Sequence, residues 1–279
     1  MSLERALDAL VSSEPLERLL LERARPILAR AEAGEDALVA ALARVLEAPV
    51  LAVAPGPREA EALAAGLEAY LGAERVALLP AWESLPYEGI GPSPEIAARR
   101  AEAARRARAA SGPFVLVAPA LAAMQGLVPT LGEVPPLELA PGRALPPEEL
   151  AAALVELGYV RTDVVEHRGE LAVRGGVLDL FPGTARRPVR LEYWGDEIES
   201  IREFVPSTQL STERVARALV PPVRELVVDE RVRARAAAEA GRHLDRFRDG
   251  LQRLADGLLA EGAEALAPLL FDHLPTPSE

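Results

Sequence analysis

The feature that most constrains the fold is the alternation of short apolar runs with helical stretches over residues 1–127. Short apolar runs bounded by turn residues are typical of buried strands, and the stretches between them follow the helical period of about 3.6 residues. This alternation favours an α/β layer built on a parallel sheet. The expected strands are Pro49–Ala54, Arg75–Leu79 and Phe114–Ala118, and the expected helices are Leu3–Ala33 (broken at Pro15 and Pro26), Asp36–Leu46, Arg58–Leu71 and Pro94–Ala110.

The pattern changes after this first segment. Residues 128–147 hold six prolines and mark a boundary, and a helix expected at Glu148–Leu157 is followed by long strand-like runs. These runs are Glu170–Phe181, Pro188–Trp194 and Glu197–Phe204, the last two joined by a tight turn at Gly195-Asp196. Pro221-Pro222 then precedes a second helical stretch, Arg231–Leu270. We therefore predict three segments, residues 1–127, 128–219 and 220–279, of which the middle one is a smaller β-rich α+β domain.

Composition excludes several kinds of site. The chain has no Cys, which rules out disulfides and thiolate metal ligands, and its three His residues are scattered, so no zinc site is expected. All 31 basic residues are Arg, so no lysine can hold a phosphate or form a Schiff base. The net charge of −12 disfavours tight binding to duplex DNA, which depends on cationic contacts to phosphates.

Hydropathy and composition also bear on where such a chain works. It has no uninterrupted apolar run of about 18 residues, and its first residues lack the pattern of a signal peptide. We expect a soluble, cytoplasmic, monomeric protein that does not associate with membranes. The use of Arg in place of Lys, together with 25 prolines, is typical of a thermophile with a GC-rich genome.

Residues 158–212 carry two long and distinctive motifs. They are Arg-Gly-Gly-Val-Leu-Asp-Leu-Phe-Pro at Arg174–Pro182 and Gly-Asp-Glu-Ile-Glu-Ser-Ile-Arg at Gly195–Arg202. With these motifs the segment resembles the second domain shared by the excision-repair helicase UvrB and the bacterial transcription-repair coupling factors. The run Thr208-Gln209-Leu210-Ser211 departs from that family, which usually has Arg where Leu210 stands.

A third motif, Leu-Pro-Ala-Trp-Glu-Ser-Leu-Pro-Tyr at Leu79–Tyr87, resembles the signature of the coupling factors rather than that of UvrB. UvrB carries a tyrosine-rich hairpin after the corresponding point and uses it to pry into damaged DNA. Here only Glu88–Pro94 separates Tyr87 from the next expected helix, which is too short for such a hairpin. Taken by themselves, Trp82 and Tyr87 are most simply explained by core or loop packing.

The resemblance implies a nucleotide site whose phosphate loop would precede the helix at Asp36–Leu46. Counting back from the strand at Pro49, the equivalent loop is Ala29–Asp36, in which Gly34-Glu35-Asp36 occupies the place of Gly-Lys-Ser/Thr. Reversing the sign of a charge about 4 Å from a phosphate turns an attraction of roughly 4 kcal/mol into a similar repulsion. We therefore predict a degenerate site with no cofactor, no metal and no catalytic residue, in which Glu35 and Asp36 are first-turn helix residues.

Three further patterns have simpler explanations than function. Val227-Val228-Asp229-Glu230 imitates a Walker B strand end, but an N-cap at the start of a helix is the better interpretation. The arginines within Arg99–Arg108 spread around a helix and indicate a solvated face rather than a nucleic-acid site. Gly175-Gly176 indicates a bulge or a close backbone approach within a strand.

A two-residue turn at Gly195-Asp196 fixes the register of the predicted hairpin. That register pairs Trp194 with Glu197, Glu192 with Glu199 and Arg190 with Ile201. Alternation then places Val189, Leu191, Tyr193 and Ile198 on the core face, and Arg190, Glu192, Trp194, Glu197 and Glu199 on the outward face. An exposed Trp flanked by Arg has the composition of an interface hot spot, and a Trp packed flat on Arg stems fits the same pattern.

The resemblance implies a degenerate helicase-type, P-loop-like domain assembled from the first and third segments, with the smaller domain inserted between them. It further implies that the inserted domain binds UvrA, the damage-sensing ATPase of nucleotide excision repair, through Arg174, Arg190 and Trp194. In the family, RNA polymerase and DNA are bound by other domains, and a C-terminal domain masks the UvrA-binding face, so we expect this chain to be an excised fragment. An active ATPase or helicase fragment and a DNA-damage-binding module are the alternatives.

Overall fold

The computed structural model describes residues 3–21, 34–84, 89–242, 245–258 and 262–278. Its internal contacts divide the chain into two compact units. The first unit comprises Met1–Ala81, Ala103–Gly126 and Thr276–Glu279, and the second comprises Trp82–Glu102 and Leu127–Pro275. Each unit has its own hydrophobic core.

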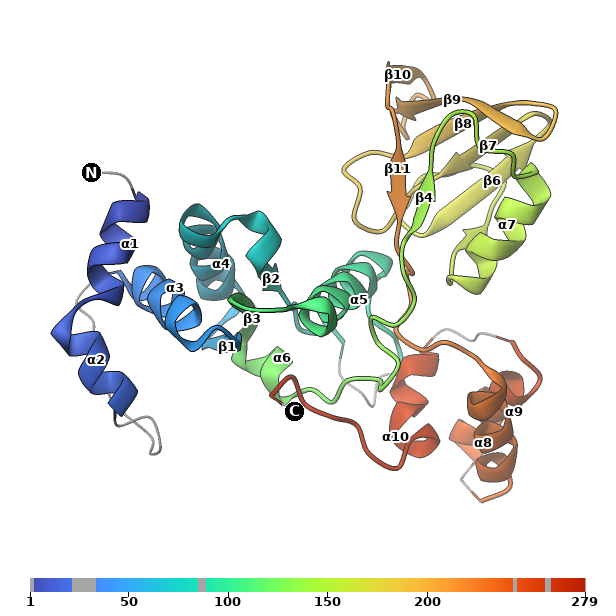
Figure 1. Ribbon diagram of the computed structural model, residues 1–279. Coiled ribbons are helices and arrows are strands. Elements are labelled where there is room, and N and C mark those ends of the chain that lie inside the picture. The colour runs from blue at the N-terminus through green and yellow to red at the C-terminus, as the bar shows by residue number, and fades with distance from the viewer. Residues whose placement is uncertain (1–2, 22–33, 85–88, 243–244, 259–261, 279) are drawn as a thin grey trace. The chain divides into compact units, whose positions relative to one another are not determined.

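The first unit contains a three-stranded parallel sheet in the order β1-β3-β2 (Figure 1). Its strands are β1 (Pro49–Ala54), β2 (Val76–Leu78) and β3 (Phe114–Pro119), and its helices are α1 (Leu3–Val11), α2 (Glu14–Leu21), α3 (Glu35–Leu46), α4 (Pro57–Leu71), the short η1 (Ala73–Arg75) and α6 (Ala120–Met124). Alanines of α3 and α4 are almost fully buried in this core, where their small side chains let the helices pack closely. The α/β class and the three parallel strands expected from the sequence are confirmed.

The second unit is built around a six-stranded sheet in the order β10-β9-β8-β7-β6-β5, antiparallel except for the β5–β6 pair. Its strands are β5 (Val160–Arg161), β6 (Glu170–Arg174), β7 (Val177–Leu180), β8 (Val189–Trp194), β9 (Glu197–Phe204) and β10 (Ser211–Arg214). Helix α7 (Pro147–Glu156) packs against one face of this sheet and buries Leu150 and Leu154 there (Figure 1). Strands β4 (Leu137–Leu139) and β11 (Ala218–Val220) form a separate antiparallel pair.

Helices follow β11 in the second unit. They are α8 (Glu230–Ala240), α9 (Asp245–Ala255), η3 (Ala263–Leu266) and α10 (Ala267–Leu270), so the helical stretch expected at Arg231–Leu270 is divided by turns. The carboxylate of Asp229 accepts a hydrogen bond from Val232 N at 2.8 Å, which confirms the helix-start interpretation of that acidic residue. In the part of the chain that the structure describes, no helix is both long and apolar enough to cross a membrane.

The run Glu170–Phe181 is a hairpin, so of the two expectations for Gly175-Gly176 the bulge within a strand is wrong, while Gly176 does lie close to another backbone, its carbonyl accepting from Tyr193 N at 2.9 Å. These two glycines form the turn between β6 and β7, whose last and first residues, Arg174 and Val177, are directly paired. Gly175 has a φ of 58°, a left-handed conformation that suits a two-residue hairpin turn and that glycine adopts at little cost. Because β6 and β7 are neighbours, their side chains can cooperate across the sheet.

The register of the next hairpin, β8–β9, is predicted correctly at its turn and wrongly beyond it. Trp194 pairs with Glu197 as expected, but Glu192 pairs with Ser200 and Arg190 with Arg202. One extra residue, Glu199, shifts the register on β9. The physical reason is that Ile198 and Ile201, three residues apart, are both buried in the core, which strict alternation forbids.

A buried ion pair at Arg100 corrects, at that residue, the expectation that the arginines of helix α5 (Pro94–Ala109) form a solvated face, whereas Arg108 is exposed as expected. The side chains of Arg100 and Glu225 are both fully buried, and Arg100 Nε lies 2.6 Å from Glu225 Oε1. The same oxygen accepts a hydrogen bond from Trp82 Nε1 at 2.6 Å. Trp82 of the coupling-factor signature thus packs against α5 and the segment after β11, as the simpler explanation predicted, whereas Tyr87 lies outside the described residues.

Candidate interaction site

Three charged side chains meet on the face of the six-stranded sheet that lies opposite α7. Alternation places Arg174 of β6, Asp179 of β7 and Arg190 of β8 on this outer face, because Asp179 pairs directly with Arg190 and the neighbouring Ala172. The apolar residues of the same face form a small core of their own, made of Val165, Ala172, Phe181 and Phe204. Arg174 therefore lies on the same face of the sheet as Arg190, which the sequence alone did not determine.

Asp179 holds both arginines. Its carboxylate is fully buried; Oδ1 accepts from Arg190 Nε at 2.7 Å, and Oδ2 accepts from Arg190 Nη2 at 2.9 Å. Oδ2 also accepts from Arg174 Nη2 at 2.6 Å. The two parallel bonds from Arg190 are the fork geometry in which a guanidinium binds a carboxylate most strongly.

Arg190 is largely covered, which corrects the expectation that it stands on an open outward face. Its side chain is only 18% exposed, and its guanidinium lies 4.9 Å from the centre of the Phe204 ring. Nη1 donates to the carbonyl of Gln209 at 3.1 Å and to Ser211 Oγ at 3.4 Å. The hydrogen bonds to Asp179 raise the pKa of Arg190 above its usual value, so it stays charged.

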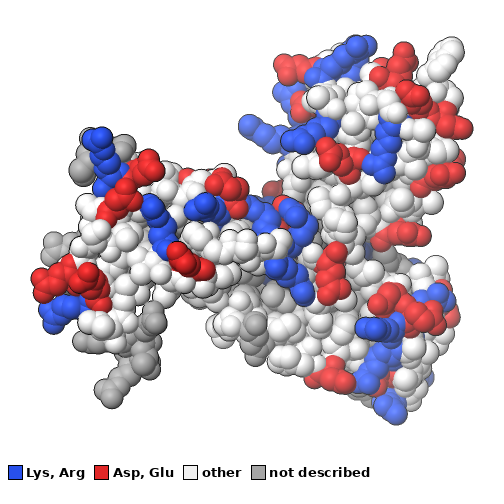
Figure 2. Space-filling view, viewed as in Figure 1, with Lys and Arg blue, Asp and Glu red and all other residues white. Residues whose placement is uncertain are grey.

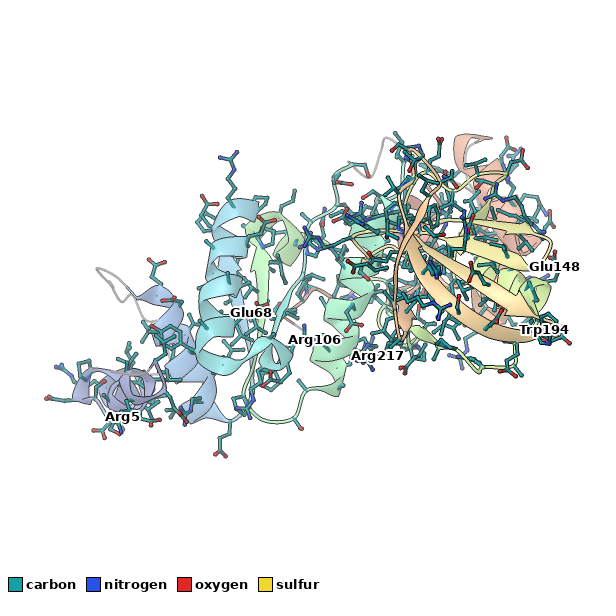
Figure 3. All side chains as sticks on the ribbon, turned by 90° about the horizontal axis from the view of Figure 1, so that it is seen from above. Arg5, Glu68, Arg106, Glu148, Trp194 and Arg217 are labelled. Atoms are coloured by element: carbon teal, nitrogen blue, oxygen red, sulfur yellow. The ribbon has the colours of Figure 1, made fainter. Side chains whose placement is uncertain are left out.

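Arg174 and Trp194 are the members of this site that reach solvent. The Arg174 side chain is 48% exposed and Trp194 is 80% exposed. Both residues end their strands at the edge of the sheet where the β6–β7 and β8–β9 turns lie, and Trp194 stands at the end of the yellow strands in Figure 3. Glu197, which pairs with Trp194 across the hairpin, and Glu199 of the same strand are both exposed. An exposed apolar ring and a fixed guanidinium at the same end of one sheet are groups that can bind a protein surface.

Asp179 is the residue of this candidate site that the sequence did not single out. It stands in the strand Val177–Leu180, where the side chains on either side of it in sequence are buried in the core. An Asp within an apolar strand is costly to bury unless it is paired, and this signal could have found it. Leu210, which stands where the family usually has Arg, is 67% exposed. It follows Gln209, whose carbonyl accepts a hydrogen bond from Arg190.

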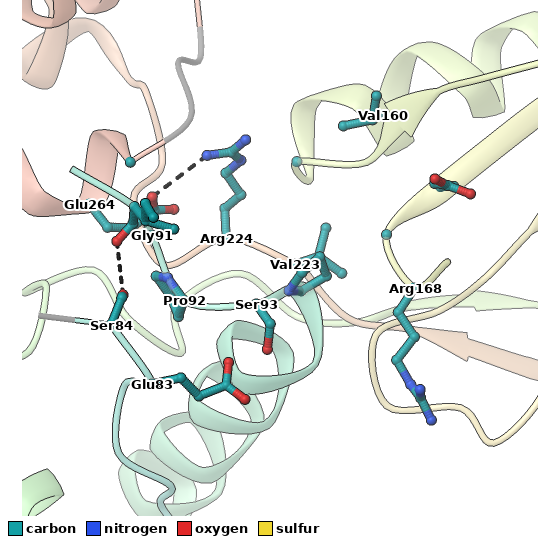
Figure 4. Close-up of a pocket in the computed structure, with 16 residues that line it drawn as sticks. Glu83, Ser84, Gly91, Pro92, Ser93, Val160, Arg168, Val223, Arg224 and Glu264 are labelled. Atoms are coloured by element: carbon teal, nitrogen blue, oxygen red, sulfur yellow. Dashed lines mark hydrogen bonds and ion pairs between the residues drawn. The ribbon is translucent and has the colours of Figure 1, made fainter. Parts of the chain in front are cut away.

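A second candidate is an open hollow of about 610 Å³ in the second unit, lined in part by Ser84, Arg168, Arg224 and Glu264 (Figure 4). Arg224 lies 3.6 Å from the buried Glu264, whose pKa is raised by burial and lowered in part by that arginine. Ser84 Oγ donates to the carbonyl of Ile90 at 2.9 Å. Arg168 pairs with Glu95, whose carboxylate lies 3.5 Å from Arg168 Nη1, so the charges of this hollow are engaged mainly in ion pairs within the second unit.

The predicted phosphate-loop residues lie at the start of α3. Gly34 has a φ of 79°, and Glu35 and Asp36 form the first turn of the helix, as expected. Residues 29–33 of the proposed loop lie outside the described residues. Within the described ranges, no group of three or more His, Cys, Asp or Glu side chains is arranged to hold a metal. On the face shown in Figure 2, arginine and carboxylate side chains are interspersed.

Comparisons with known proteins agree with the resemblance seen in the motifs. Residues 137–226 match the family described as the UvrB interaction domain. The chain is 42% identical, over 94% of its length, to the transcription-repair-coupling factor of Mycobacterium bovis. It is 33% identical to that of Myxococcus xanthus over 84% of its length, and 30% identical to that of Escherichia coli over 85%. It spans 21–23% of the length of these relatives.

Proposed function

We propose that this chain, which is similar to transcription-repair coupling factors over 94% of its length, is a non-catalytic module that docks UvrA on the outer face of its six-stranded sheet. The observation that carries the proposal is an indole that is 80% exposed and lies at the same sheet edge as a guanidinium held by a buried carboxylate. Trp and Arg are the residue types that most often dominate binding energy at protein interfaces.

The electrostatics of this face support a protein partner. Arg174 offers hydrogen-bond donors to a partner carboxylate, and Trp194 offers apolar area that is otherwise left in water. Glu197 and Glu199 supply a charged rim, which sets orientation and association rate more than affinity. Duplex DNA would meet these carboxylates with repulsion, so a DNA-damage-binding module fits the site less well.

Replacing Trp194 or Arg174 with alanine should weaken UvrA binding about thirtyfold each, the loss of roughly 2 kcal/mol typical of an interface anchor. Melting temperatures should stay near the wild-type value because both side chains reach solvent. Calorimetric titration with purified UvrA, with circular dichroism as the folding check, measures both quantities. Arg214, exposed on the edge strand β10, supplies the matched control Arg214→Ala, which should bind normally. Wild-type affinity in both folded variants would place the docking site elsewhere.

We also propose a wider role, which the similarity to the coupling factors supports. In the whole protein, this module would recruit UvrA to RNA polymerase stalled at DNA damage, while other domains would contact the polymerase and drive ATP-dependent translocation on DNA. We further propose that the α/β unit is a helicase-type domain whose nucleotide site is degenerate at Gly34-Glu35-Asp36. The acidic first turn of α3 and the absence of lysine from the chain support this proposal.

The chain should therefore show no binding of MgATP. A γ-phosphate near the start of α3 would meet the carboxylates of Glu35 and Asp36 instead of a lysine and a hydroxyl. Isothermal titration calorimetry with MgATP is the measurement, and the expected result is no heat beyond dilution. Saturable binding in the micromolar range would show that the chain has an intact nucleotide site.

A further inference from the structure

We infer that Asp179 is the positioning residue of this docking site and that Arg190 acts through Asp179 rather than on the partner. In this arrangement Arg174 and Trp194 make the contacts, and the buried carboxylate fixes the guanidinium that Arg174 presents. The inference rests on the proposed function, because it divides the work among residues of the same surface.

The hydrogen bonds assign these separate roles. Arg190 donates to both carboxylate oxygens of Asp179 and, through Nη1, to Gln209 and Ser211. Each of its three guanidinium nitrogens therefore already donates a hydrogen bond within the domain. Arg174 uses Nη2 at 2.6 Å from Asp179 Oδ2, while its side chain remains 48% exposed. The guanidinium of Arg190 is thus held by Asp179, Gln209 and Ser211, whereas the guanidinium of Arg174 is held by Asp179 through Nη2.

Charge and order point to the chemistry of the partner group. Two guanidinium groups around one carboxylate leave one positive charge in excess, and the exposed Arg174 displays it. A guanidinium already held in one orientation loses less conformational freedom on binding than a free one. The group that this arrangement recognises best is a carboxylate of the partner, which would lie close to the apolar partner surface that covers Trp194.

A double-mutant cycle tests the inference. Asp179→Asn should lower UvrA affinity at least tenfold in the wild-type background, because the amide no longer holds Arg174 by charge. In the Arg174→Ala background the same change should alter affinity less than twofold, since the residue that Asp179 positions is gone. A merely structural role would give the same loss in both backgrounds, and that result would overturn the inference.

Arg174→Lys provides a second test that does not depend on how well Asp179→Asn folds. Lysine keeps the positive charge but lacks the planar fork, so UvrA affinity should fall at least fivefold with an unchanged melting temperature. Wild-type affinity in Arg174→Lys would mean that a mobile point charge suffices, against the inference. If Trp194→Ala and Arg174→Ala also bind UvrA normally, the proposed function itself fails. If these two variants lose binding while Asp179→Asn and Arg174→Lys keep it, only the positioning role of Asp179 fails.

Discussion

Replacing Arg190 with alanine is expected to lower the free energy of unfolding of the second unit by about 3–5 kcal/mol, the usual cost of removing one partner of a buried ion pair. The fully buried Asp179 would lose its bidentate partner and keep only the single contact from Arg174. The Phe204 ring would also lose the guanidinium that covers it. A melting temperature lower by on the order of 10 °C should result, measured by calorimetry or circular dichroism.

The control for this experiment is Arg202→Ala. Arg202 pairs with Arg190 across β8 and β9 and lies on the same face, but its nearest carboxylate, on Glu192, is 3.9 Å away and its side chain is 32% exposed. Its loss should cost less than about 1 kcal/mol. If Arg190→Ala melts like Arg202→Ala, then Asp179 is not held in the buried pair described here.

Replacing Glu225 with alanine is expected to have an effect of similar size. Its carboxylate is the buried partner of Arg100 Nε and of Trp82 Nε1, each at 2.6 Å. Without it, a fully buried guanidinium and an indole N–H lose the acceptor that they share, and breaking such a pair costs about 3–5 kcal/mol. Thermal or urea unfolding, followed by circular dichroism, measures the loss.

Glu148→Ala is the matched control for Glu225. Glu148 also binds an arginine, with its two oxygens 2.7 and 3.0 Å from Arg161, but the pair lies in solvent. Its removal should leave the melting temperature almost unchanged. An equal shift in the two variants would contradict the conclusion that burial, rather than ion pairing itself, makes Glu225 important.

The elements of the fold that could be predicted from the sequence are those that depend on local pattern. The three parallel strands and the turn at Gly195-Asp196 follow from apolar runs and turn residues, and the structure confirms them. The shift on β9 did not follow from strict alternation, because it depends on Ile198 and Ile201 entering one core together. The register shift is visible in the sequence only as the three-residue spacing of these two isoleucines.

The candidate site was predictable only in its exposed part. Trp194 stood out because it is a large apolar residue on a charged strand, and its exposure is confirmed. The burial of Arg190 and the role of Asp179 depend on three strands meeting, and spacing along the chain does not show which carboxylate an arginine will bind. The same limit hid the pair between Arg100 and Glu225, which are 125 residues apart.

The two buried ion pairs, at Asp179 and at Glu225, are expected to differ in what they contribute to binding and to folding. A buried ion pair adds little net stability over well-packed apolar residues, because desolvation offsets most of the attraction. On the outer face, however, Asp179 also fixes the exposed guanidinium of Arg174 at 2.6 Å. We expect the pair at Asp179 to matter for binding as well as folding, whereas the pair at Glu225 should matter for folding alone.

The affinity of purified UvrA for the double variant Arg174→Ala/Trp194→Ala, compared with that for the unchanged chain, decides whether UvrA docks on this sheet face. We expect the unchanged chain to bind and the folded double variant to bind at least about a hundredfold more weakly, since two anchors of roughly 2 kcal/mol each are lost. A folded double variant that binds UvrA as tightly as the unchanged chain would contradict the assignment of this sheet face as the docking surface.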